Sequence, residues 1–316
     1  MKGPPSLRSH LSCGLLLLGI LLLAACARTP LQLDELAAEE LGEPRSMELT
    51  DVPFFRQEAY QCGPAAMATL MNHRGLEIAP EQLTPQMYLP GRRGSLQIEL
   101  LTAARRQGFL AYVHAPELTG LLTQIRAGHP VLVLQNLALD RVPVWHYAVV
   151  VGFDLDADEI LLRSGTTRRE RLSLRRFERT WQRGDYWAIS LHQTGELPEQ
   201  PDETRYLRAV AALEQVERWA DAEAGYLAAV ERWPDSATAW FGLGNSRYQQ
   251  DDFAAAEEHY RQALRRDALQ PAIHHNLAWA LIRQHRADEA RPHAEEAARL
   301  ADDDQPHYRA ALEALR

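Results

Sequence analysis

The chain has 316 residues, a length that indicates about two domains. Hydrophobic residues make up 46% of it and charged residues 24%, a globular mixture that excludes a wholly disordered or collagen-like chain. The net charge is −9 without any long basic block, which argues against a nucleic-acid partner, and 3 cysteines are too few for a disulfide-stapled scaffold.

Residues 1–25 have the pattern of a secretory signal peptide, with a short basic region before an apolar run at 14–25 that is shorter than the roughly 20 residues of a membrane span. The run ends in Leu-Ala-Ala-Cys, which resembles the bacterial lipobox. This resemblance implies a lipid on Cys26 that anchors the chain in a membrane. Ala27 then implies the outer membrane of a bacterial cell envelope, with the protein facing the periplasm. The alternative is an ordinary signal peptide with a chance cysteine. Residues 26–47 would form a tether.

Cys62 is then the one thiol left over, because the other two cysteines belong to the signal and the lipid anchor. A helix is predicted to begin at or just after it, since Pro64 suits a first helical turn and Met67, Leu70 and Met71 share one helical face. The dipole at a helix start favours a thiolate and lowers the thiol pKa. Cys62 is therefore a candidate nucleophile, and a buried inert thiol is the alternative.

Two more side chains fit the chemistry of a nucleophilic thiol. Gln57 lies five residues before Cys62, and its amide with the Cys62 backbone N–H would form an oxyanion hole. His146 opens the apolar strand 146–153 and would serve as the general base. The alternatives are a solvated loop glutamine and a core histidine whose hydrogen bonds are satisfied.

These motifs in this order resemble the C39-like (bacteriocin-processing-type) cysteine peptidases, which have a papain-like fold, over residues 48–192. The resemblance implies that Cys62 is the nucleophile, that Gln57 belongs to the oxyanion hole and that His146 is the base. It also implies a peptide or protein substrate.

The third member of that family's triad is an acid in an Asp-Pro step at the end of the next strand. Ser164 and Gly165 stand there in this chain. A serine orients an imidazole by a hydrogen bond but lacks the full charge that stabilises imidazolium. Gln135 and Asn136 follow the short apolar strand 131–134, and an amide there is an alternative orienting group, unless these residues simply end that strand.

The rest of this region predicts a mixed α+β domain. Helices are expected at 95–107 and 116–127, and Gly108 ends the first of them. Strands are expected at about 130–135, 146–153, 159–163 and 186–191. Residues 193–202 are polar and rich in proline, which is typical of a linker.

Residues 203–316 repeat with a period of 34, as in the series Ala222, Ala256 and Ala290. The pattern resembles the tetratricopeptide repeat, an all-α solenoid of helix–turn–helix units. The units are 203–236, 237–270 and 271–304, and residues 305–316 would form a capping helix. The repeats are expected to bind a protein partner, or to pack on the first domain. A generic alanine-rich bundle is the alternative.

The sequence therefore predicts a lipid-anchored cysteine peptidase. Two other functions remain open, a non-catalytic peptide-binding scaffold and an acyl or amide transferase that uses the same thioester. The chain has no phosphate-binding loop, HExxH motif or paired CxxC, so no cofactor or metal is predicted.

Overall fold

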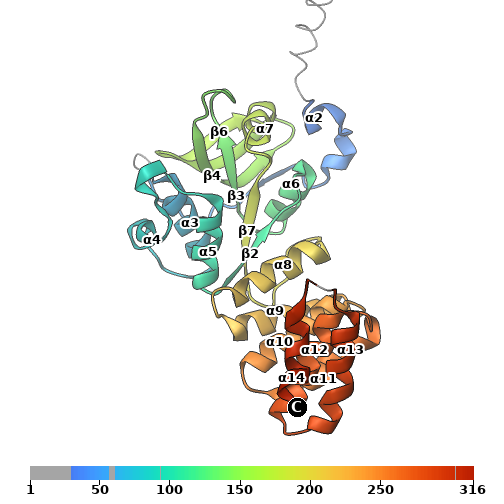
Figure 1. Cartoon of the computed structure of the whole chain (residues 1–316). Helices are drawn as coiled ribbons and strands as arrows, with labels where there is room; N and C mark the ends of the chain where they lie inside the picture. The colour runs from blue at the N-terminus through green and yellow to red at the C-terminus, as the bar shows by residue number, and fades with distance from the viewer. Residues whose placement is uncertain (1–29, 57–60, 93, 303) are drawn as a thin grey trace, which may run out of the picture.

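Antiparallel strands form one sheet in the N-terminal region (Figure 1). The computed structural model describes residues 30–56, 61–92, 94–302 and 304–316. In this part of the chain the sheet has seven strands, of which six pair in the order β2-β7-β3-β4-β5-β6 and the seventh, β1, pairs with β4 outside that path. The strands are β1 (Ser46–Glu48), β2 (Phe109–Val113), β3 (Val131–Asn136), β4 (Trp145–Asp154), β5 (Glu159–Ser164), β6 (Thr167–Ser173) and β7 (Ala188–Gln193).

Helices cover both sides of the sheet, with α3, α4 and α5 on one side and α6 and α7 on the other (Figure 1). Their bounds are α2 (Gln32–Glu35), α3 (Cys62–His73), α4 (Pro80–Met87), α5 (Gln97–Arg106), α6 (Leu118–Arg126) and α7 (Leu174–Gln182), with 3-10 turns η1 (Ala38–Leu41) and η2 (Pro90–Arg92). The predicted α+β class is confirmed.

The register of three neighbouring strands sets the positions of the polar residues at their ends. Gln135 on β3 lies opposite His146 on β4, and Val149 on β4 lies opposite Arg163 on β5. Residues that face each other across an antiparallel pair share one face of the sheet. Because β4 runs antiparallel to both neighbours, the last residues of β3 and of β5 lie beside the first residues of β4, where His146 is.

The predicted helices at 95–107 and 116–127 correspond to α5 and α6, and the predicted strands correspond to β3, β4, β5 and β7. The elements β2, β6, α4 and α7 were not predicted. Strand β6 has the sequence TRRERLS, and most of its side chains are exposed because it lies at the edge of the sheet. Such a strand lacks the alternating apolar pattern that identifies strands in a sequence.

Residues 30–47, which the sequence suggests as part of a tether, pack against the domain. Strand β1 pairs with the end of β4. The fully buried carboxylate of Glu178 on α7 accepts hydrogen bonds from the backbone N–H groups of Gln32 and Leu33. A buried carboxylate needs such donors, so this contact fixes α2 to α7.

The helical region confirms the predicted repeats. Helices that begin the units start at residues 203, 237 and 271, and their partners start at 219, 253 and 287, so both series keep the period of 34. The helices are α8 (Glu203–Glu214), α9 (Trp219–Arg232), α10 (Ala237–Gln249), α11 (Phe253–Arg266), α12 (Pro271–Arg283) and α13 (Ala287–Leu300), followed by η3 (Pro306–Arg309) and α14 (Ala310–Ala314). The buried side chain of Ala311 on α14 covers the last apolar face.

Close contacts between repeat helices depend on glycines. A Cβ atom on Gly242 would overlap the ring of Tyr226, and one on Gly244 would overlap the ring of Tyr260. Both tyrosines are almost fully buried. The aromatic rings thus occupy space that the glycines leave free.

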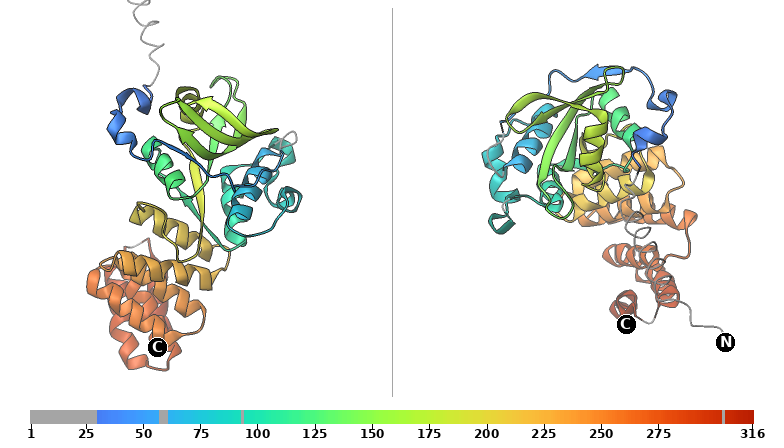
Figure 2. Two further views of the ribbon diagram at one scale, coloured as in Figure 1. Left: turned by 180° about the vertical axis from the view of Figure 1, so that it is seen from behind. Right: turned by 90° about the horizontal axis from the view of Figure 1, so that it is seen from above.

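The repeats pack directly on the first domain, below β2 and β7 (Figure 2). Leu110 and Tyr112 of β2 share one apolar cluster with Tyr206 and Val210 of α8. The segment 193–202 is held at this junction, since the Tyr112 hydroxyl accepts a hydrogen bond from the Asp202 N–H at 3.1 Å.

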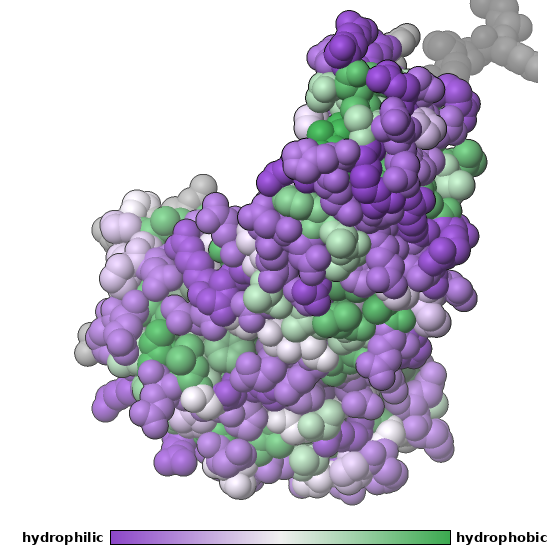
Figure 3. All heavy atoms as spheres, turned by 90° about the horizontal axis from the view of Figure 1, so that it is seen from below, coloured by the Kyte–Doolittle hydropathy of each residue, from purple (hydrophilic) through white to green (hydrophobic). Residues whose placement is uncertain are grey.

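Among the described residues, no helix has both the length and the apolar character that crossing a membrane requires. The face in Figure 3 is mostly hydrophilic, with separate hydrophobic areas between the polar side chains.

We predict that Gly242→Ala lowers the free energy of unfolding by about 1–3 kcal/mol, because the new methyl group meets the Tyr226 ring. Urea denaturation followed by circular dichroism measures this change. Gly120→Ala on α6 is the matched control, since its Cβ would meet only the Cβ of Glu117 at 3.8 Å. It should stabilise by up to about 1 kcal/mol. Equal changes in the free energy of unfolding for the two variants would contradict the claim that Gly242 makes room for the Tyr226 ring.

Candidate active site

Cys62 is the first residue of α3 and lies half-buried against the apolar core. Its sulfur forms a hydrogen bond with the backbone of Tyr147, the residue that directly follows His146. The start of α3 and the start of β4 therefore meet at this thiol. The helix start was predicted from Pro64, which is its third residue.

The environment of Cys62 disfavours the thiolate. Burial raises the pKa of the Cys62 thiol, and backbone hydrogen bonds from Tyr147 and Gly63 offset only part of that effect. This corrects the expectation that the helix start lowers the pKa. The removal of the sulfur from water outweighs the hydrogen bonds from the backbone around it, including those at the helix start.

His146 is half-buried at the start of β4. Its Nε2 atom lies 3.0 Å from the Oγ atom of Ser164, a hydrogen-bond distance. Burial lowers the pKa of the imidazole, so the ring is neutral at neutral pH. Among the described residues His146 makes no hydrogen bond with Cys62. It directly precedes Tyr147, whose backbone bonds to the thiol.

Glu170 is a carboxylate near His146 that sequence reasoning missed. It lies half-buried on β6, opposite Leu162 of β5. Its negative charge raises the pKa of His146, against the larger effect of burial. Glu170 and Ser164 line the same cavity. The sequence does not single out Glu170, because arginines flank it on both sides. Such a run of charges is typical of a solvent-exposed surface.

Among the described residues, no hydrogen bond joins the side chain of Asn136 to His146. Asn136 accepts hydrogen bonds through Oδ1 from the N–H groups of Ala138 and Val144, at 3.1 and 3.0 Å, so its amide closes its own loop. The proposed use of Asn136 as an orienting group is therefore not supported. Gln57 lies outside the described residues.

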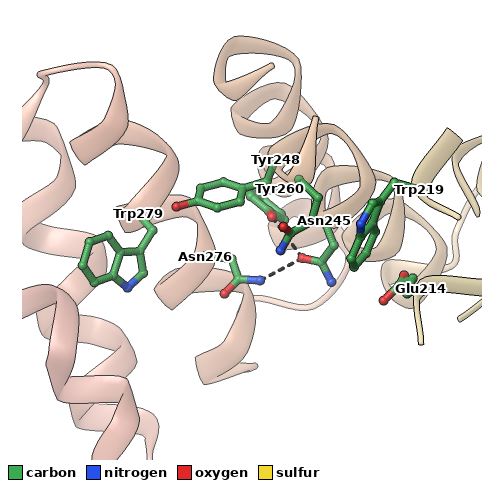
Figure 4. A pocket seen from close by; sticks show the side chains of 8 residues that line it. Glu214, Trp219, Asn245, Tyr248, Tyr260, Asn276 and Trp279 are labelled. Carbon is green, nitrogen blue, oxygen red and sulfur yellow. Dashed lines mark hydrogen bonds between the residues drawn. The ribbon is translucent and has the colours of Figure 1, made fainter. Parts of the chain in front are cut away.

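A second candidate site lies between the repeat helices (Figure 4). It is a cavity of about 470 Å³ with Trp219, Trp279 and Tyr248 among its lining residues. At its centre Asn245 Oδ1 accepts hydrogen bonds from the Tyr260 hydroxyl at 3.0 Å and from the Asn276 amide at 2.8 Å. Aromatic faces with a central amide can hold an extended peptide.

Comparisons with known proteins agree with this organisation. The sequence profile of the Peptidase_C39 like family matches residues 49–188, and that of the tetratricopeptide repeat matches residues 206–271 and 243–306. A comparison with curated proteins gave no match.

Three similar solved structures represent the two regions. A protein assigned as a C39-like peptidase from Bacillus anthracis is 18% identical over 48% of this chain and 98% of its own, with a TM-score of 0.40. YrrB, a tetratricopeptide-repeat protein with an unusual peptide-binding site, is 23% identical over 36% of this chain and 58% of its own, with a TM-score of 0.34. The type III secretion chaperone SycD of Yersinia enterocolitica, in complex with a peptide of the translocator YopD, is 18% identical over 37% of this chain and 95% of its own, with a TM-score of 0.34.

We predict that Glu170→Gln lowers the pKa of His146, because it removes the charge that favours the protonated ring. An NMR titration of the His146 imidazole measures the change. Glu159→Gln is the matched control, since Glu159 lies on the neighbouring strand and pairs with Arg171. An unchanged or raised pKa in Glu170→Gln would contradict the prediction.

Proposed function

We propose that this chain, in which a domain of the C39-like peptidase family at residues 49–188 precedes tetratricopeptide repeats, is a cysteine peptidase. The observation that carries the proposal is the hydrogen bond between the Cys62 sulfur and the backbone of Tyr147, next to His146. This hydrogen bond supports the proposal that the thiol of Cys62 and the imidazole of His146 act on the same substrate. Peptide bonds are the substrate class.

In the proposed reaction, the Cys62 sulfur attacks the carbonyl carbon of a peptide while His146 takes the thiol proton. A C–S bond forms, and the carbonyl oxygen gains the negative charge. The backbone N–H of Cys62 stabilises that charge, and the family resemblance adds Gln57 to this oxyanion hole. The His146 imidazolium then protonates the leaving amine, and water hydrolyses the thioester.

Both reacting groups are neutral before substrate binds, according to the directions of their pKa shifts. Burial raises the pKa of Cys62 and lowers that of His146. The free protein therefore holds a thiol and a neutral imidazole rather than a standing ion pair. Proton transfer accompanies the attack, so His146 acts as a general base.

Ser164 and Glu170 support His146 in this mechanism. The hydrogen bond between His146 Nε2 and Ser164 Oγ holds the ring in one orientation. The charge of Glu170 favours the imidazolium that forms during the attack. Together they would replace the single aspartate of the family's triad. Ser164 would orient the imidazole, and Glu170 would supply the negative charge.

A non-catalytic scaffold is the second candidate function. The raised pKa of Cys62 favours it, because a buried neutral thiol is a weak nucleophile without an effective base. A transferase is the third, since an amine can capture the same thioester in place of water.

The repeats are proposed to bind a peptide segment of a substrate or partner in the cavity around Asn245 and Asn276. A lipid on Cys26 is proposed to anchor the protein to the outer membrane, facing the periplasm. The sequence at 23–26 supports that part of the proposal.

We predict that a peptide p-nitrophenyl ester acylates Cys62, and that peptide mapping by mass spectrometry locates the adduct on that residue. Cys62→Ala should give no adduct at position 62. His146→Ala should slow its formation by about 10²- to 10⁴-fold, the usual contribution of a general base. His307→Ala, an exposed histidine of the repeats, should leave the rate unchanged.

The same experiment separates the three functions. Absence of any adduct at Cys62 would contradict the peptidase and favour the scaffold. An adduct that added amines remove much faster than water does would favour the transferase.

A further inference from the structure

A cavity of about 480 Å³ adjoins His146 on the side of α7. Its lining includes Ser164, whose hydroxyl bonds to His146, and Gln135, which lies opposite His146 on the neighbouring strand. A group bound there would lie one side chain away from the proposed base.

Arginines dominate this cavity. Four of them line it, against one carboxylate among the described lining residues, Glu170. They are Arg175, Arg176, Arg179 and Arg183. The chain as a whole carries a net charge of −9, so this concentration of positive charge is local.

Two of the four guanidinium groups already have partners. Arg175 pairs with Asp34 at 2.7 Å, and Arg183 donates to the backbone carbonyl of Asn136 at 2.9 Å. The side chains of Arg176 and Arg179 have no ion pair or hydrogen bond among the described residues.

The arginines of the neighbouring strand differ from these two. Arg169 pairs with Glu48 at 2.7 Å, and Arg171 pairs with Glu159 at 3.1 Å. Like charges three or four residues apart destabilise a helix, and Arg176 and Arg179 have this spacing on α7. An anion in the cavity would relieve that repulsion.

We propose that this arginine cavity binds an acidic side chain, Asp or Glu, of the peptide substrate. The planar guanidinium group presents a fork of N–H donors that matches a carboxylate. The inference rests on the proposed peptidase function, to which it adds the substrate class: peptides with a carboxylate close to the cleaved bond.

The rim of the cavity favours a peptide over a free anion or a lipid surface. Leu137 belongs to the lining, and the same loop exposes Leu139 and Val142, with 74% and 70% of their surfaces accessible. Apolar side chains next to the acidic residue would cover this loop. A concave site receives a single side chain, whereas the headgroups of a bilayer meet a flat or convex surface.

Fluorescence anisotropy of a labelled peptide on the full chain carrying Cys62→Ala tests the proposal without any catalysis. The peptides are Leu-Glu-Glu-Leu and its Leu-Gln-Gln-Leu counterpart. The Glu peptide should bind about tenfold or more tightly than the Gln peptide at low salt, a preference typical of hydrogen bonds to a charged group. Sodium phosphate should compete with it.

The double variant Arg176→Gln/Arg179→Gln should lose this preference, and Arg176→Lys/Arg179→Lys should keep part of it. Both arginines are exposed, so the fold should persist, and urea denaturation checks this. Arg171→Gln, outside the cavity and paired with Glu159, should leave the affinity for the Glu peptide unchanged.

Equal binding of both peptides, or full binding by the double Gln variant, would overturn the proposal. So would binding to phosphatidylglycerol vesicles with no binding to the Glu peptide. Arginine-dependent peptide binding without an acyl adduct on Cys62 would support this site while contradicting the peptidase.

Discussion

The contact between the Cys62 sulfur and the backbone of Tyr147 joins the helical side of the first domain to its sheet. The thiol belongs to the first turn of α3, and the backbone group belongs to Tyr147, the third residue of β4. The pairing of β4 with β5, whose side chains are mostly buried, brings Ser164 to His146. A shift of β4 would therefore affect both the contact of Cys62 with Tyr147 and the contact of His146 with Ser164.

Charges of both signs line one cavity next to Ser164, the hydrogen-bond partner of His146. Glu170 favours the imidazolium, whereas the arginines of α7 provide positive charge for a carboxylate of the substrate. A carboxylate bound to Arg176 or Arg179 would add negative charge near the ring at the moment of attack. Substrate recognition and activation of the base are then parts of the same electrostatic arrangement.

The sequence predicted those parts of the site that depend on local patterns. Pro64 indicated the helix start at Cys62, and an apolar run identified the strand of His146, because both signals lie within one element. The position of Glu170 depends on pairing at a sheet edge, and its neighbours hide it in a charged run. The sequence left two roles for Asn136, orienting His146 or ending its strand. The hydrogen bonds of its side chain with the backbone of the following loop favour the second role. The pKa of Cys62 depends on burial by the whole domain, which no local motif reports.

The central claim is that Cys62 and His146 form a neutral pair in the free protein. The pH dependence of Cys62 alkylation by iodoacetamide, followed by mass spectrometry of the peptide that contains it, tests this claim most directly. The account predicts a single rise in rate at alkaline pH, with an apparent pKa above that of a free thiol. A rate plateau that extends below neutral pH and disappears in His146→Ala would reveal a standing thiolate–imidazolium pair and contradict the account.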